Sequence, residues 1–565
     1  MTFTEFPYQR PVLEDYTERF VELLDSFAYA NTYKKQEEVL EQISEMRNEF
    51  ETMNNLCRIR HSIDTANKTY EEENTFFDIN YPQYEALNIR FYNLLVNARF
   101  KDQLEQKFGS QLFTIAELNL KTFKPEILGG LRNENCLKSE YTKLRASARI
   151  QFNGAEYNLS SILPLEISTD RATRKAASEA KWDFYVKKSE EVEGIYDSLV
   201  RRRHNMAVEL GYSNFVELGY ARMLRSEYNA KDIATFRELI HKYVVPVATE
   251  LRERQAKRIG LDKLKYYDEG LNFKSGNPNP KGEPTWIVDN AKNMYGELSN
   301  ETNEFFNFML DNDLLDLVAK KDKAPGGYCS FINKYKAPFI FSNFNGTSGD
   351  IDVLTHEAGH AFQVYSSRDI GVHEYAWPTF EACEIHSMSM EFFTWPWMNS
   401  FFEEDTDKYK FLHLSSSLMF LCYGSAIDEF QHFVYENPDI STEARNQAWR
   451  KIEKKYMPYR DYDGYEFLEK GGFWQRQGHL FSMPFYYIDY VLAQICAFQF
   501  WLRDRQDHDT AWQDYVELCK AGGSQPFLEL VKLANLQSPF DESCIQSVVK
   551  GIKTWLDSVD DADIA

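Results

Sequence analysis

Two histidines that are four residues apart, with a glutamate directly after the first, stand in the segment THEAGHAFQVY, residues 355–365. Helical structure is expected here, and residues four apart share one helical face, so His356 and His360 can hold one metal ion together. Glu357 can reach a water on that metal. Zinc lowers the pKa of such a water to about 7, and a carboxylate can take its proton. The spacing predicts a zinc site with its own base. The alternative is a pair of structural histidines on a core helix, because HExxH arises by chance in about one such chain per hundred.

A zinc site needs a third protein ligand. The pattern HExxHxxGxxH does not apply, because Gln363 and Ser366 occupy its glycine and third-histidine positions. The later segment PTFEACEIHSMSMEFF offers three glutamates, Glu381, Glu384 and Glu391, whose spacings of three and seven put them on one helical face. The residues alone leave the choice among them open, and a solvated acidic face is the alternative explanation.

Together, HEAGHAF and EACEIHSMSMEFF resemble the M3 zinc metallopeptidases, the thimet oligopeptidase and oligoendopeptidase F group, and within it the oligoendopeptidase F/Pz-peptidase branch. The resemblance implies a glutamate ligand followed by a small polar residue at +3 and a second glutamate at +7. Glu384 matches, with Ser387 and Glu391 at those places and a separation from His356 of 384 − 356 = 28 residues. Glu381, at 25 residues, is close to the thermolysin-like spacing and stays a rival ligand.

An acidic side chain is also expected to orient the first histidine. Asp352 lies four residues before His356, on the same helical face, and can accept the hydrogen bond of its second ring N–H. Asp350 competes for this role.

A second block that resembles the family covers residues 464–494, GYEFLEKGGFWQRQGHLFSMPFYYIDYVLAQ. The resemblance implies a histidine and tyrosines over the scissile carbonyl, and His479, Tyr487 and Tyr490 occupy the matching positions. Such donors stabilise the oxyanion that forms when water attacks an amide. The two tyrosines are three residues apart, so both hydroxyls can face one cavity. The alternative to a catalytic role is that they are ordinary core residues, because the chain contains 34 tyrosines. Gly471-Gly472 and Gly478 are interpreted as a loop that closes on substrate.

The elements around these motifs are expected to be mostly helical. Apolar residues recur every three or four positions in residues 33–56, 174–210 and 236–260. Strands are expected in ARIQFNGAEYNLS, in KLKYYDEGLNF and in YCSFINKYKAPFIFSNFNGT, where KAPFIFSNF is expected to offer an edge to an extended peptide. The fold class is mostly α with a small sheet next to the HExxH helix. The family resemblance implies a helical body split by a deep substrate channel. A soft boundary divides a helical N-terminal region, 1–190, from a catalytic region, 191–565.

Charge and cysteine content indicate which partners and which cellular location to expect. The chain has 64 basic and 87 acidic residues, a net charge of −23, which argues against nucleic acid or an anionic membrane as partner. Eight scattered cysteines without a CxxC pair are typical of reduced thiols. The N-terminus carries charges where a signal peptide needs an apolar run, and no window is apolar enough to span a membrane. A cytoplasmic protein is expected.

The function predicted from motifs and resemblance is a zinc endopeptidase that cuts internal bonds of short peptides, with one Zn²⁺ per chain. Resemblance to Pz-peptidases suggests collagen-derived Gly-Pro peptides as substrates. One alternative is a helical HExxH carboxypeptidase or dipeptidyl carboxypeptidase, which needs a cation such as Arg476 or Arg460 for the terminal carboxylate. Others are a non-catalytic zinc peptide-binding scaffold and a metal-free structural protein. The scaffold leaves Glu357 without a role.

Overall fold

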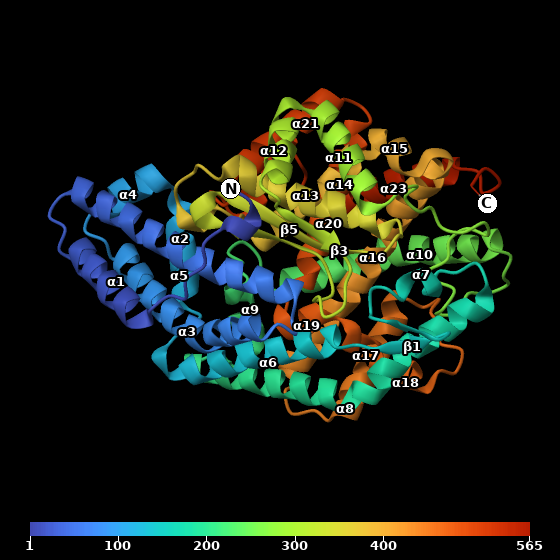
Figure 1. Ribbon diagram of the computed structural model, residues 1–565, viewed down its shortest axis with the longest axis horizontal. Helices are drawn as coiled ribbons and strands as arrows, with labels where there is room; N and C mark the ends of the chain where they lie inside the picture. The colour runs from blue at the N-terminus through green and yellow to red at the C-terminus, as the bar shows by residue number, and fades with distance from the viewer. Residues whose placement is uncertain (565) are drawn as a thin grey trace.

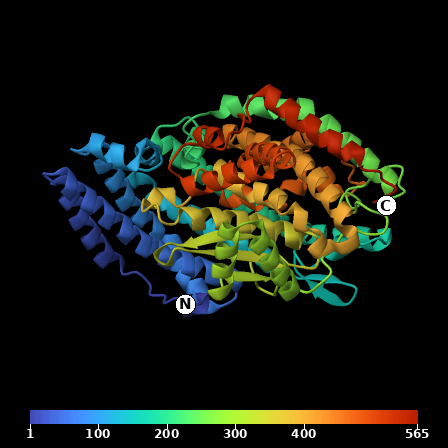
Figure 2. The ribbon, with the colours of Figure 1, turned by 90° about the horizontal axis from the view of Figure 1, so that it is seen from above.

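The chain begins with long helices that stand to one side of the molecule, on the left of Figure 1. The computed structural model describes residues 1–564. The N-terminal helices are α1 (Leu13–Ala28), α2 (Tyr33–Ile63), α3 (Lys68–Val96), α4 (Lys101–Phe108), α5 (Ser110–Leu120) and α6 (Leu128–Ala146). Viewed from above, in Figure 2, helices α1 to α5 form an arm beside the larger body, whereas α6 packs against that body.

The longest helix, α8 (Arg171–Leu210), runs along the base of the molecule in Figure 1. Asp170 caps its N-terminus by accepting the backbone N–H of Thr173 at 2.9 Å, and it ends at Gly211, whose φ of 98° terminates the helix. The helices predicted from periodicity are confirmed as α2, α8 and α10 (Ala230–Arg258). Helix α8 continues through residue 190. The proposed boundary between an N-terminal region and a catalytic region at this residue stays a prediction.

Two small sheets contain all the strands found in residues 1–564. The first lies in ARIQFNGAEYNLS, where strands were expected, and is a hairpin in which β1 (Ile150–Phe152) pairs antiparallel with β2 (Ala155–Tyr157). Its turn residues, Asn153 and Gly154, both have positive φ, 48° and 80°. Asn-Gly is the preferred pair for such a tight turn.

The second sheet has the strand order β3-β5-β4 and lies directly before the HExxH helix. The strand β5 (Ala337–Phe344) pairs parallel with β3 (Leu315–Val318) and antiparallel with β4 (Tyr328–Ile332). The expected strand KAPFIFSNF is therefore central, and the expectation that it offers a free edge is wrong. The sequence did not predict β3, whose short LDLV run covers the edge of β5.

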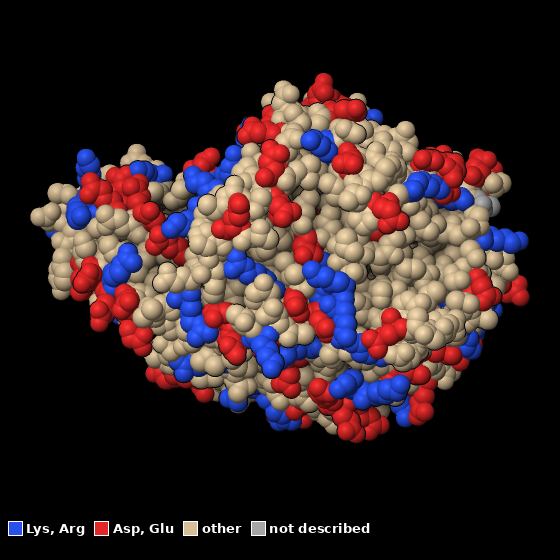
Figure 3. All heavy atoms as spheres, in the orientation of Figure 1, with Lys and Arg blue, Asp and Glu red and all other residues tan. Residues whose placement is uncertain are grey.

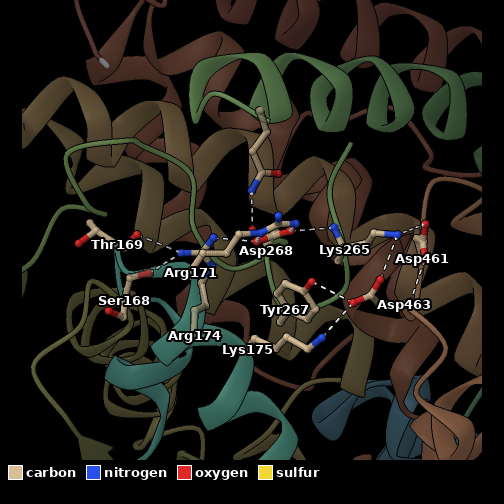
Figure 4. A network of polar contacts seen from close by, with 11 residues as sticks. Ser168, Thr169, Arg171, Arg174, Lys175, Lys265, Tyr267, Asp268, Asp461 and Asp463 are labelled. Atoms are coloured by element: carbon tan, nitrogen blue, oxygen red, sulfur yellow. Dashed lines mark hydrogen bonds and ion pairs between the residues drawn. The ribbon is translucent and has the colours of Figure 1, made fainter. Parts of the chain in front are cut away.

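The strand expected in KLKYYDEGLNF is absent from the described chain, and residues 266–270 form a turn instead. Figure 4 shows the polar contacts of this segment. Asp268 explains the difference, because its carboxylate accepts the backbone N–H of Lys265 at 3.0 Å and closes a tight turn. Arg174 and Arg171 of α8 each donate to the same carboxylate at 2.7 Å. A buried carboxylate with two arginine partners fixes the segment against α8 and removes its backbone from strand pairing.

Four helices form the centre of the body and are buried along most of their lengths: α13 (Gly349–Ser367), α14 (Phe380–Phe393), α16 (Thr406–Glu436) and α20 (Tyr487–Asp504). The remaining helices surround them: α7 (Leu163–Glu166), α9 (Phe215–Arg222), α11 (Pro284–Leu298), α12 (Asn300–Asp311), α15 (Asn399–Phe402), α17 (Thr442–Tyr456), α18 (Glu466–Glu469), α19 (Gly478–Ser482), α21 (His508–Ala521), α22 (Phe527–Leu533) and α23 (Glu542–Ser558). The mostly-α fold class is confirmed.

The surface is mixed in charge. On the face shown in Figure 3, acidic and basic side chains are interspersed rather than segregated. No helix among residues 1–564 combines the length and the apolar composition that crossing a bilayer requires. All eight cysteines are unpaired.

Candidate metal centre and active site

Three ligand atoms from two helices converge at the centre of the body. His356 and His360 lie one turn apart on α13, and Glu384 lies on the neighbouring α14. The Nε2 atoms of His356 and His360 are each 3.3 Å from Oε2 of Glu384. Two ligand atoms about 2.1 Å from a zinc ion at the tetrahedral angle lie about 3.4 Å apart, so the spacing and the N,N,O donor set fit zinc.

The two helices that carry these ligands approach each other closely at Gly359, in the middle of the HEAGH segment. A Cβ atom at this position would lie 2.6 Å from the carbonyl oxygen of His386 and 2.7 Å from Cα of Ser387. Any larger residue would therefore push α13 away from α14. The glycine keeps the ligands of the two helices within reach of one ion.

Glu384 is held by hydrogen bonds as well as by the histidines. The Ser387 hydroxyl donates to its Oε2 at 2.8 Å, and the Tyr486 hydroxyl donates to Oε1. Burial alone would raise the pKa of the Glu384 carboxyl. The neighbouring His360 and His356 have the larger, opposite effect and hold that pKa well below its usual range. The sequence did not single out Tyr486, although its neighbourhood, FYYIDY, belongs to the tyrosine block.

Glu391 orients the first histidine. Its carboxylate accepts a hydrogen bond from Nδ1 of His356 at 2.7 Å and one from Nε2 of His413 on α16 at 2.7 Å. The indole of Trp395 donates to Nδ1 of His413 at 3.0 Å, which leaves Nε2 as that ring's donor. With its own Nδ1 protonated, His356 directs the Nε2 lone pair toward Glu384, as a metal ligand must.

The expectation that Asp352 orients His356 is wrong. Asp352 instead accepts a hydrogen bond from the hydroxyl of Tyr409 at 2.7 Å. Asp350, its competitor, accepts the backbone N–H groups of Asn345 and Gly346 at 2.9 and 2.8 Å, and so fixes the loop that leads into α13.

Glu357 lies beside the ligand cluster with a carboxylate that is free to accept a proton. Its side chain is buried, and Oε2 has no hydrogen-bond partner in the described chain. Burial raises its pKa. The loop before β4 covers it so closely that a Cβ at Gly327 would lie 3.2 Å from Oε1. An isolated, desolvated carboxylate is a stronger base than one in water.

His479, Tyr487 and Tyr490 line one cavity of about 450 Å³ together with His356 and Glu391, which we call the catalytic cavity. Both tyrosines face it, as their spacing predicted. Nε2 of His479 lies 3.2 Å from the hydroxyl of Tyr490. Burial lowers the pKa of His479 to about 4, so the ring is neutral near pH 7.

Glu381, the rival ligand, points elsewhere. The hydroxyl of Tyr228 donates to its Oε1, and the side chain is 1% exposed. It is not part of the group of ligand atoms that His356, His360 and Glu384 form.

The glycines that were interpreted as a closing loop have a packing role. A Cβ at Gly471, whose φ is 95°, would lie 2.0 Å from the carbonyl oxygen of Asn446. A Cβ at Gly472 would meet the ring of Phe467 at 2.4 Å. Close contact with backbone at Gly471 and with a side chain at Gly472 accounts for both glycines. The closing of this loop, with Gly478, on substrate stays a prediction.

A helical fold with an HExxH helix, a glutamate from the next helix and a free buried base defines a metallopeptidase. Comparisons agree: residues 3–123 match the Peptidase M3 N-terminal domain, and residues 165–549 match Peptidase family M3. The chain belongs to peptidase family M3, among the metallo-oligoendopeptidases, and acts on peptides.

Three relatives show how far the similarity reaches. A structure of Pz peptidase A with an inhibitor is 57% identical, with a TM-score of 0.99 over 99% of this chain and 100% of that one. A Bacillus anthracis str. Ames protein assigned to oligoendopeptidase F is 56% identical, with a TM-score of 0.94 over 99% of both chains. The chromosomal oligoendopeptidase F of Lactococcus lactis subsp. cremoris is 22% identical over 414 residues, 71% of this chain but only 65% of that protein's length.

Proposed function

We propose that this protein is a zinc-dependent endopeptidase that hydrolyses internal bonds of short oligopeptides. The observation that carries the proposal is the convergence of ligand atoms of His356, His360 and Glu384 within 4.8 Å of one another. The unpartnered oxygen of Glu357 lies on the residue next to the first of them. These three side chains would hold one zinc ion per chain, which would supply Lewis acidity to a bound water or substrate.

The chain's own residues divide the reaction between them. Bound zinc supplies Lewis acidity, which makes water nucleophilic near neutral pH. Glu357 takes a proton from the attacking water and delivers it to the leaving amine. Tyr490 and His479 donate to the oxygen that becomes negative as water adds to the peptide carbonyl. Tyr487, on the same cavity wall, holds the peptide.

Burial of the site supports short peptides as substrates. The side chains of His356, His360 and Glu384 are only 19%, 11% and 1% exposed. A flexible peptide can enter a channel to such a site, whereas the surface of a folded protein cannot reach it. The similarity to Pz peptidase A supports collagen-derived Gly-Pro peptides as one substrate class. Unpaired cysteines support a cytoplasmic location.

A short peptide blocked at both ends tests the proposal. We expect internal cleavage, read by mass spectrometry, that stops with a chelator and returns with zinc. Glu357→Gln should retain one zinc per chain and lose at least about a hundredfold in turnover, because it removes the base but no ligand. Cleavage that persists in the chelator, or near-normal turnover by Glu357→Gln, would contradict the mechanism. Bound zinc without cleavage would favour an exopeptidase or a binding scaffold.

A further inference from the structure

A second cavity, of about 470 Å³, adjoins the catalytic cavity. His479 lines both cavities. Gly327, which packs against the carboxylate of Glu357, also lines the second one. Most of the remaining wall comes from α6, α7, α8 and residues 476–482. A peptide whose scissile bond lies at Glu357 can therefore extend directly into this space, which we call the basic cavity.

The basic cavity carries an excess of positive charge in a chain whose net charge is −23. Four charged side chains line it: Arg145, Lys181, Arg476 and Glu166. Lys181 donates to both carboxylate oxygens of Glu166, at 2.6 and 2.7 Å, so these two neutralise each other. Two guanidinium groups remain without a counter-charge on the wall.

Neither guanidinium forms an ion pair or a hydrogen bond with a carboxylate anywhere in residues 1–564, and each packs against aromatic carbon. Arg145 lies 5.7 Å from the ring centre of Tyr141, and its Nε is buried without a hydrogen bond. Arg476 lies 4.8 Å from the ring centre of Phe473. A guanidinium stacked on a ring presents its N–H edge to a ligand, and that edge matches a carboxylate.

Arg460, a nearby arginine outside the basic cavity, has the carboxylate partners that Arg145 and Arg476 lack. Arg460 donates to Glu269 at 2.8 Å and to Glu453 at 3.2 Å, so its charge is already balanced. Arg145 and Arg476 are half-buried and have no carboxylate partner of this kind, so their N–H groups can serve a ligand. The pair in the basic cavity is thus a binding feature rather than a structural ion pair.

We propose that Arg145 and Arg476 bind a carboxylate of the peptide substrate and make the basic cavity a subsite for an anionic group. The inference rests on the proposed peptidase function and adds a determinant of specificity to it. Two sources supply the same chemistry: the C-terminal carboxylate of a short peptide, or an acidic side chain beyond the scissile bond.

The first experiment compares peptide substrates that differ only in negative charge. One N-terminally blocked peptide is made in three forms: with a free C-terminal acid, with an amide, and as an amide with glutamate near its end. In the wild type, we expect at least one anionic form to show a KM at least about tenfold below that of the neutral amide, because a charge-assisted hydrogen bond contributes this much. Preference for the free acid assigns the terminal carboxylate, and preference for the glutamate form assigns a side chain.

Variants then locate the preference. Arg145→Gln and Arg476→Gln should each reduce the ratio of KM values between amide and preferred acid. Arg202→Gln is the matched control, because Arg202 is also a half-buried arginine without a carboxylate partner in the described chain, yet it lies outside the cavity. It should keep the wild-type ratio. Equal KM values for all three peptides, or a preference that survives in both cavity variants, would overturn the proposal.

A binding measurement separates this proposal from the peptidase function. Zinc-loaded Glu357→Gln should bind the fluorescently labelled acid more tightly than the amide, by the same factor as in the KM values. If no peptide is cleaved but this difference persists, the subsite stands and the proposed reaction fails. If the peptides are cleaved but bind alike, the reaction stands and the subsite fails.

Discussion

Glu391 is expected to control zinc affinity without touching the metal. Its carboxylate accepts hydrogen bonds from His356 Nδ1 and His413 Nε2, both at 2.7 Å. Glu391→Gln preserves shape but offers one acceptor oxygen and one N–H₂ group, so it cannot accept from both rings. One histidine then faces a donor, and the negative charge that favours the protonated Nδ1 of His356 disappears.

The size of the effect follows from these contacts. A hydrogen bond to a charged group contributes about 1.5–3 kcal/mol. At about 1.4 kcal/mol per tenfold change, this converts to a loss of about 10- to 100-fold in zinc affinity, the range found for partners of metal-binding histidines.

Competition with a chelator of known affinity at neutral pH gives the zinc Kd of each variant. Asp352→Asn is the matched control, because Asp352 is a half-buried acid on the same face of α13 as His356 but contacts Tyr409 instead. It should change the Kd by less than about threefold. Thermal unfolding of the metal-free proteins checks that both variants fold. An unchanged Kd for Glu391→Gln, or an equal loss for Asp352→Asn, would refute the reasoning.

Three further outcomes are expected. Glu384→Ala should weaken zinc binding by more than about a hundredfold, the largest loss found for residues that contact a metal ligand but not the metal. Glu381→Ala should leave the zinc Kd unchanged and lower the melting temperature, because Tyr228 loses its acceptor. The opposite result would make Glu381 the third ligand. Tyr490→Phe should reduce kcat by about 10²–10³ with zinc content unchanged, and a change below tenfold would remove its hydroxyl from oxyanion stabilisation. Burial lowers the pKa of His432 from 6.5 to about 4, so stability present above pH 6.5 should fall as pH drops toward 4. His432→Gln should reduce that dependence in urea unfolding, because His432 is one of several buried histidines with a lowered pKa. An unchanged dependence would exclude a contribution from His432.

The sequence predicted the parts of the site that depend on spacing along a single helix. His356 and His360 meet because they are four apart, and Glu384 was preferred over Glu381 through the family resemblance. The same logic failed for Asp352, although it also lies four residues from His356. Which acid meets Nδ1 depends on how α14 and α16 pack against α13, and that information is not local.

The fold shows the same limit. Long amphipathic helices and the Asn-Gly hairpin were predictable, since their signals are local. The segment KLKYYDEGLNF reads as a strand, but its conformation is set by Asp268 and by arginines about 95 residues earlier in the chain. The roles of Tyr486 and Arg145 were likewise not predictable, because each depends on neighbours from distant elements.

The tight contact at Gly359 has a consequence for how the protein responds to metal loss. In a zinc finger the ion is the core, and the chain unfolds when it leaves. Here α13 and α14 are fixed against each other by backbone contact, and the ligands are held by hydrogen bonds with Glu391, Ser387 and Tyr486. The ion therefore enters a site whose ordering cost was met during folding. We therefore expect the metal-free protein to stay folded and to become active when zinc is added, without refolding.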